Sequence, residues 1–156
     1  MTCVLCDAPA SAGDVVFEDD DTLVILHNDW SVPGHVMLVS KHHVENPSAL
    51  DEEQWLRFAR LWHRVERAIL DEHVATAALS GRGAAEGSGT HMLPSEKVIA
   101  LKLGIMTPHL HVHLYPFPAN VTREEVFAVI DMKTRVPRDE AFVARLQTAL
   151  LTPPGD

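Results

Sequence analysis

The feature that most constrains this chain is a strict alternation of histidine and apolar residues over 109–114, which reads His-Leu-His-Val-His-Leu. In a β-strand, alternate side chains point to the same side. The run therefore predicts a strand with His109, His111 and His113 on one face and apolar side chains, able to seal a core, on the other. Three solvated histidines are the simplest alternative, but strict alternation beside a wholly apolar face favours a functional site.

Two chemistries suit three aligned histidines: a shared metal ion, or a row of side chains with separate roles. His109 and His113 lie four residues apart, about 13 Å along a strand at roughly 3.4 Å per residue. Zinc–nitrogen bonds are about 2 Å long, so one ion held by all three is disfavoured. In a row, the middle imidazole can meet the reacting atom while its neighbours orient it or bind something else. Imidazole is a nucleophile that titrates near neutral pH.

The rest of the chain predicts an α+β fold. Strands are expected over 14–18, 22–27, 35–40, 97–103 and 109–115, with three aspartates at 19–21 making a turn. Asp51 and Gln54 form a capping-box pattern, followed by apolar residues at helical spacing that predict one long helix to about residue 78. A capping box at Thr122 and Glu125 and an amphipathic segment within 137–151 predict helices near the C-terminus. Strands with helices between and after them are typical of an antiparallel sheet in an α+β protein.

A length of 156 residues predicts a single domain over 1–156. Its core is expected over about 3–118, followed by a helical extension over 119–156. The Gly/Ser-rich stretch 80–95 is expected to be a flexible insertion loop. A lid over a site and a plain surface insertion are both open for this loop, and the surface insertion is favoured.

Charge and composition exclude several classes of function. The formal net charge is −9, which disfavours nucleic acid as a partner because such binding needs a basic surface. It leaves room for one small anionic ligand in a local site. No apolar run is long enough to span a membrane, and no secretory leader pattern is present. Two cysteines cannot form a disulfide framework, which fits a reducing, cytoplasmic location.

Two further motifs accompany the alternating histidines. Pro33-Gly34-His35 precedes the expected third strand, which is followed by Lys41-His42-His43. Cys3-x-x-Cys6 lies near the N-terminus. Alone, this pair is compatible with metal binding, with redox chemistry or with coincidence.

Taken together, these motifs resemble the histidine triad (HIT) superfamily over roughly residues 3–118. The segment 104–111, Gly-x-Met-x-Pro-His-Leu-His, is similar to that of bacterial diadenosine tetraphosphate hydrolase-like HIT-domain proteins. The resemblance implies an antiparallel sheet of about five strands, one long central helix and a homodimer. It also implies hydrolysis or nucleotidyl transfer at the α-phosphate of a nucleoside phosphoramidate or dinucleoside polyphosphate. A non-catalytic module that binds a nucleotide or zinc is the alternative.

The resemblance assigns a role to each histidine of the motif. His111 would attack the α-phosphorus and form a nucleotidyl-histidine intermediate, which water then resolves. His113 would hydrogen-bond the phosphate or assist the leaving group, and His109 would help to frame the site. His35 would support the triad from the neighbouring strand.

The same resemblance implies a structural zinc ion and a nucleotide-binding region. Zinc ligands in members that carry the metal fall on Cys3, Cys6, His43 and His109. The base and ribose region falls at the end of the second expected strand, on Leu26, His27, Asn28 and Asp29. For Asp29, a bond to the ribose and a plain turn are equally favoured.

This chain departs from the family pattern at three positions near the phosphate. Met106 stands where many members have a polar phosphate contact, and Ile99 and Ile105 replace asparagines. Polar contacts to a nucleotide are therefore expected to be fewer. The remaining histidines receive no role: His63 and His73 are expected on the surface of the long helix, and His91 lies in the 80–95 loop.

Overall fold

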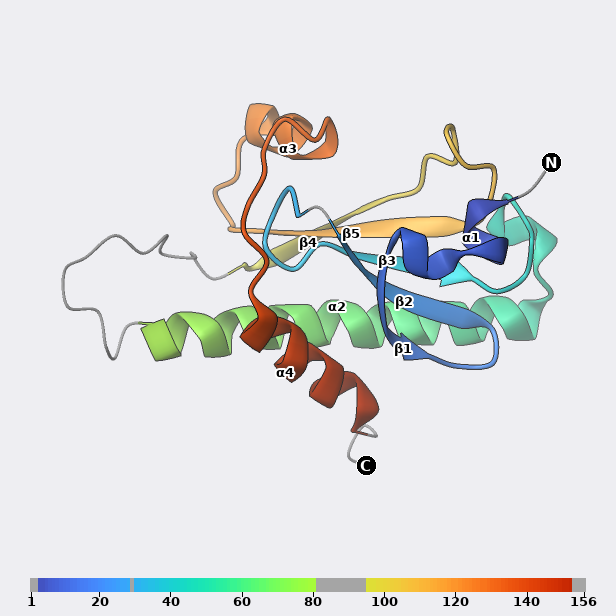
Figure 1. The fold of residues 1–156 in the computed structure, drawn as a ribbon, viewed down its shortest axis with the longest axis horizontal. Helices are drawn as coiled ribbons and strands as arrows, with labels where there is room; N and C mark the ends of the chain where they lie inside the picture. The colour runs from blue at the N-terminus through green and yellow to red at the C-terminus, as the bar shows by residue number, and fades with distance from the viewer. Residues whose placement is uncertain (1–2, 29, 81–94, 153–156) are drawn as a thin grey trace.

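The computed structural model describes residues 3–28, 30–80 and 95–152. Figure 1 shows a five-stranded sheet with helices on both sides. The elements in chain order are α1 (Val4–Asp7), a 3₁₀ turn (Pro9–Ser11), β1 (Gly13–Glu18), β2 (Thr22–His27), β3 (Val36–Ser40), a second 3₁₀ turn (Pro47–Ala49), α2 (Glu52–Ser80), β4 (Lys97–Leu101), β5 (His111–Phe117), α3 (Arg123–Ile130) and α4 (Glu140–Leu151). The predicted α+β class is confirmed, with its antiparallel sheet, one long helix and C-terminal helices.

The strand order is β1-β2-β3-β5-β4, and every neighbouring pair is antiparallel. Strand β5 lies between β3 and β4, with His111 opposite Val39 and His113 opposite Met37. The histidine strand is therefore held on both sides, while β1 and β4 form the two edges of the sheet. Side chains on β5 are thus positioned by hydrogen-bonded strands on both sides.

The histidine strand begins two residues later than predicted. His109 precedes β5, and its backbone N–H donates to the carbonyl of Thr107 at 2.8 Å. The predicted strand over 109–115 is thus wrong at its start, because the chain is still turning at His109. The strand also runs to Phe117, through Pro116, which pairs only with β4. A position with one neighbouring strand tolerates proline.

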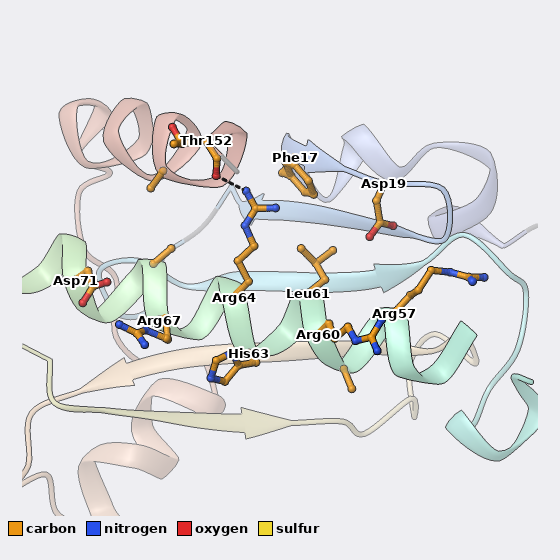
Figure 2. A pocket seen from close by; sticks show the side chains of 13 residues that line it. Phe17, Asp19, Arg57, Arg60, Leu61, His63, Arg64, Arg67, Asp71 and Thr152 are labelled. Carbon is orange, nitrogen blue, oxygen red and sulfur yellow. Dashed lines mark hydrogen bonds between the residues drawn. The ribbon is translucent and has the colours of Figure 1, made fainter. Parts of the chain in front are cut away.

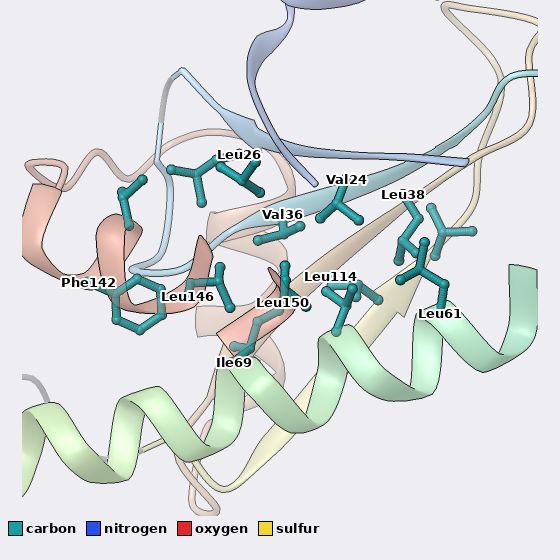
Figure 3. Close-up of a cluster of buried hydrophobic side chains, with 14 of the residues drawn as sticks. Val24, Leu26, Val36, Leu38, Leu61, Ile69, Leu114, Phe142, Leu146 and Leu150 are labelled. Carbon is teal, nitrogen blue, oxygen red and sulfur yellow. The ribbon is translucent and has the colours of Figure 1, made fainter. Parts of the chain in front are cut away.

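The main core lies between the sheet and helices α2 and α4. Figure 3 shows Ile69 of α2 and Leu146 of α4 converging with Leu114 on the underside of the sheet. These three side chains are essentially fully buried. Burying apolar surface of this kind contributes about 1.5–3 kcal/mol per side chain. This core holds the back of β5 and leaves its histidine face to the other side.

Two smaller apolar clusters cover the histidine face at its ends. Leu5 of α1 packs against Met37 and Val39 of β3. Val129 of α3 packs against Tyr115 and Phe117 of β5. Figure 1 shows α1 and α3 on the side of the sheet away from α2. The histidines therefore lie between two covered regions of the same face.

The helix starts follow the sequence prediction. Asp51 Oδ1 accepts from the backbone N–H of Gln54 at 2.8 Å, and Gln54 Oε1 accepts from that of Asp51 at 3.0 Å. The reciprocal pair at Thr122 and Glu125 is likewise formed. No helix in the described part of the chain is long and apolar enough to cross a membrane. The predicted loop 80–95 lies outside the described residues except at its two ends, as do Asp29 and His91.

His73 is not on the surface, which corrects the sequence prediction. Its ring is 98% buried beneath the Pro-Gly-His turn, and Nε2 lies 3.1 Å from the carbonyl oxygen of Pro33. Gly34 has φ +82°, and a Cβ on it would lie 2.8 Å from His73 Nε2. Only glycine adopts this backbone conformation at low cost. Helix α2 thus supports the turn that presents His35.

Candidate functional site

His111 lies on β5 with one ring nitrogen already occupied. Its Nδ1 is 2.8 Å from the carbonyl oxygen of His109. A carbonyl only accepts, so we assign the ring proton to Nδ1 and the lone pair to Nε2. The side chain is partly exposed. His111 is therefore held in the tautomer that a nucleophile needs, with Nε2 free of this bond.

His35 and His113 share a hydrogen bond across the sheet, with His35 Nε2 at 2.9 Å from His113 Nδ1. His35 is 97% buried, and its Nδ1 has no hydrogen-bond partner among the described residues. A buried N–H without a partner is costlier than an unpaired acceptor, so the proton of His35 belongs on Nε2. His113 then accepts at Nδ1 and carries its own proton on Nε2. That N–H is a donor available beside His111.

Burial keeps these imidazoles neutral. It lowers the pKa of His35 to about 2, with smaller contributions from the neighbouring His113 and His27. It lowers the pKa of His113 to about 3, with His111 and His27 adding to the effect. His113 therefore donates a hydrogen bond as a neutral ring and brings no positive charge to the site.

Aromatic rings enclose the His35–His113 pair. His35 stacks between His27 and Tyr115, with ring centroids 4.8 and 4.3 Å away. Burial raises the pKa of Tyr115 to about 12, so its hydroxyl stays protonated. Sequence reasoning missed Tyr115, although it continues the alternation one step beyond His113. His27, predicted to contact a nucleotide, is placed beside the triad by this stack.

Acid is expected to destabilise the protein through its buried histidines. Burial lowers the pKa of His73 to about 4 against 6.5 for an exposed ring, so between these values the unfolded chain binds a proton that the folded chain does not. Stability present above pH 6.5 is then lost as pH falls. We expect His73→Gln to flatten the pH dependence of the unfolding free energy by up to about 1.4 kcal/mol per pH unit. Urea unfolding at several pH values between 4 and 7 measures this slope.

The matched control is His63→Gln, which changes an exposed histidine on the same helix. Its slope should equal that of the wild type. Slopes are compared within each variant, so a constant loss of stability in His73→Gln does not affect the result. Identical slopes in all three proteins would show that His73 is not buried in its neutral form.

A second cluster brings together the N-terminal segment, the segment after β3 and the turn before β5. Cys3, Cys6, His43 and His109 each offer one ligand atom, and these four atoms lie within 4.8 Å of one another. His109 Nδ1 is 3.4 Å from each Sγ and 3.3 Å from His43 Nδ1. Two thiols and two imidazoles with this mutual spacing are a donor set for tetrahedral zinc.

The orientation of His109 fits a ligand. Its Nε2 lies 2.6 Å from the carbonyl oxygen of Ser40, so Nε2 carries the proton and the lone pair of Nδ1 faces the cluster. Burial lowers the pKa of His109, which favours the neutral, ligand-competent ring. This position is compatible with the predicted role of His109 as a zinc ligand, and its predicted role in framing the substrate site stays a prediction.

Neighbouring residues aim His42 and His43 in different directions. His42 Nε2 is 2.7 Å from Asp21 Oδ1, and Arg57 donates to the other oxygen of Asp21. The hydrogen bonds from Arg57 and His42 lower the pKa of Asp21. His43 Nδ1 instead lies 3.2 Å from Cys6 Sγ. The hydrogen bond between His42 and Asp21 therefore helps to fix the segment that presents His43 to the cluster.

The other residues predicted to bind a nucleotide lie in varied surroundings. Leu26 is packed in the main core on the face opposite the histidines, so a ligand there could meet only its backbone. Asn28 is exposed, and its side-chain amide donates to the carbonyl of Ser11 at 3.4 Å. Met106 is 93% exposed and Ile105 76% exposed, before β5. Ile99 packs against the apolar cluster formed by Val129 of α3 with Tyr115 and Phe117.

Comparison with known proteins gives one family match. The model of the family described as HIT domain matches residues 9–118. This segment contains β1 to β5, the His35 turn and all three histidines of the alternation. The match therefore covers most of the chain and the whole of the histidine site.

Several solved structures have a similar fold. A histidine triad protein from Marinobacter aquaeolei VT8 has 21% identity and a TM-score of 0.65, with 91% of each chain covered. A histidine triad protein from Bradyrhizobium japonicum has 19% identity and a TM-score of 0.63 over 97% of each chain. A zinc-bound histidine triad family protein from Mycobacterium smegmatis has 20% identity and a TM-score of 0.62, covering 97% of this chain and 94% of its own. At sequence identities of 19–21%, the likeness to these three structures shows the fold alone.

Proposed function

The chain belongs to the HIT domain family, and on that premise we propose that it is a nucleotide hydrolase or nucleotidyl transferase acting through His111. Its substrate would be a nucleoside phosphoramidate or a dinucleoside polyphosphate, cleaved at the α-phosphate. A special likeness to diadenosine tetraphosphate hydrolases stays a prediction. The observation that carries the proposal is the bond between His111 Nδ1 and the His109 carbonyl, which leaves Nε2 as the nucleophilic atom.

In the first step, His111 Nε2 attacks the α-phosphorus. A phosphorus–nitrogen bond forms as the bond to the leaving group breaks, and the leaving atom takes up a proton from solvent. His113 would donate a hydrogen bond from Nε2 to that atom or to a phosphate oxygen, which its bond to His35 and its position beside His111 support. Neutral donors of this kind stabilise developing negative charge when they are held in place beforehand.

In the second step, water attacks the same phosphorus and the bond to His111 breaks. The products are the nucleoside monophosphate and the free imidazole, and the proton released by the attacking water returns to solvent, which balances the one taken up in the first step. This is covalent catalysis in two steps. Burial and stacking of His35 hold His113 in one orientation through both steps.

Intact-protein mass spectrometry after brief exposure to adenosine phosphoramidate, or to diadenosine tetraphosphate, tests the proposal. We expect a wild-type species heavier by one adenylyl group and none in His111→Ala. Product without any adduct at the shortest times would contradict the covalent mechanism. Thermal stabilisation by the nucleotide with neither product nor adduct would favour the binding-module alternative, for which the exposed Met106 and Ile105 argue.

We also propose a structural zinc ion held by Cys3, Cys6, His43 and His109. The mutual spacing of their ligand atoms supports it, as does the His109–Ser40 bond that fixes the free lone pair. The metal would cross-link the N-terminus to the segments before α2 and before β5. Such a site adds to folding stability and has no open position for substrate.

A homodimer and a cytoplasmic location stay predictions. Strand β4 is an edge of the sheet, and the outer side of such a strand offers unpaired backbone groups. Pairing with a second copy would satisfy them. Static light scattering of the purified chain measures the oligomeric state directly.

A further inference from the structure

A cavity of about 1150 Å³ opens on the helical side of the sheet, away from the histidines. Figure 2 shows it between α2, strand β1 and the C-terminal end of α4. We call it the arginine groove. It has no residue in common with the site on β5 or with the cysteine–histidine cluster. A ligand there would be independent of the proposed reaction.

Arginines at helical spacing run along this groove. Arg57, Arg60, Arg64 and Arg67 all line it and extend over about 15 Å of α2 at 1.5 Å per residue. They are four of the nine arginines in a chain whose net charge is −9. A cationic groove is therefore a local feature of this surface, opposite in sign to the whole molecule.

The positive charge at the centre of the groove is not balanced by paired carboxylates of the described residues. Arg57, at one end, is paired with Asp21 and Glu53. Within the described part of the chain, no carboxylate lies within ion-pair distance of Arg60, Arg64 or Arg67. The aspartates that line the groove, Asp19 and Asp71, stand toward its two ends in Figure 2.

Arg64 is held across the groove. Its guanidinium donates to the carbonyl oxygens of Leu150 and, at 2.7 Å, of Thr152 at the end of α4. It also lies over the ring of Phe17, 5.1 Å from the centroid. Carbonyl oxygens do not neutralise a positive charge, so Arg64 keeps its charge in a fixed position. Because this side chain is already held in place, it loses less conformational entropy when a ligand binds.

The groove also has an apolar lining, which a purely ionic ligand would not use. Phe17, Leu61, Ala68 and Ala149 contribute to its wall. A site that binds only phosphate needs little volume and no apolar surface. Pockets for organic ligands are typically 300–1,000 Å³ and mostly apolar, with a few placed polar groups. The groove is somewhat larger than this range, and its apolar lining and central arginines together favour an organic anion over a bare inorganic one.

We propose that the arginine groove binds an amphipathic organic anion, a small molecule with a diphosphate or two carboxylates on an apolar body. The anionic groups would lie at Arg60, Arg64 and Arg67, since guanidinium binds such oxygens in pairs. The apolar body would lie against Phe17 and Leu61.

Isothermal titration of the full-length protein tests this with three probes: geranyl diphosphate, inorganic diphosphate and geraniol. We expect geranyl diphosphate to bind at least about tenfold more tightly than either half of it. The double variant Arg60→Gln/Arg67→Gln should weaken that binding at least about tenfold. The matched control Arg123→Gln/Arg135→Gln removes two exposed arginines elsewhere and should bind as the wild type does.

Arg60 and Arg67 are exposed, so the double variant should keep the wild-type melting temperature. Three results would overturn the proposal. One is no heat of binding at millimolar geranyl diphosphate, and another is equal weakening in both double variants. The third is inorganic diphosphate binding as tightly as geranyl diphosphate, which would reduce the groove to a nonspecific anion site. Because His111→Ala leaves the groove intact, it should bind geranyl diphosphate normally, whatever its activity on nucleotides.

Discussion

His111→Ala is expected to lower kcat/KM for adenosine phosphoramidate by about 10⁴-fold or more. Removing a covalent nucleophile removes a reaction path as well as one contact, and losses of this size follow in other enzymes with such nucleophiles. A 10⁴-fold loss corresponds to about 5.4 kcal/mol of transition-state stabilisation. Release of the amine under saturating and limiting substrate measures kcat and kcat/KM separately.

His63→Ala is the matched control, because it truncates an exposed histidine on α2. It should keep the wild-type rate. His113→Ala should retain adduct formation at a reduced rate, because it removes a donor and leaves the nucleophile. A wild-type rate in His111→Ala, with the fold preserved by circular dichroism, would show that another group attacks the phosphorus.

Loss of metal is expected to have the second large effect, on stability. If zinc is present at about 1,000 times its dissociation constant, binding contributes about 4 kcal/mol. For a chain of this length, that corresponds to a fall in Tm of roughly 10 °C on chelation. Differential scanning calorimetry of zinc-loaded and chelated protein measures the fall, and elemental analysis should find one zinc per chain before chelation.

Cys6→Ser should lower Tm by a similar amount and make the protein insensitive to chelator. The control is Ser48→Ala, an exposed substitution in the segment between His43 and α2. A zinc content near zero, with both thiols of the native protein reacting rapidly with a disulfide reagent, would remove the zinc proposal. Chelation that abolishes activity while Tm stays unchanged would instead point to a metal in the reaction itself.

Local patterns predicted most of the fold. The alternation at 109–114 identified the correct faces of β5, because the two-residue period of a strand leaves little freedom. The capping boxes at Asp51 and Thr122 located the starts of two helices, because the reciprocal bonds join residues three positions apart.

Features that depend on distant contacts were not predicted. The burial of His73 arises from the turn at Pro33, forty residues earlier in the chain. A polar residue on an amphipathic helix is assigned to solvent unless its tertiary partner is known. The cluster of Cys3, Cys6, His43 and His109 could be inferred only from a family resemblance, since no spacing rule brings these four positions together. Tyr115 was missed for a simpler reason: the pattern was followed only as far as the last histidine.

His109 connects two parts of the molecule that the sequence alone would treat separately. Its imidazole faces the cysteines and His43, while its backbone carbonyl accepts a hydrogen bond from Nδ1–H of His111. A displacement of His109 would therefore change both the cysteine–histidine cluster and the hydrogen bond to His111. A chain whose cluster is disrupted would then present His111 as a mixture of tautomers, and only part of the population would be ready to react. Metal content and the burst amplitude of adduct formation should therefore vary together from one preparation to the next.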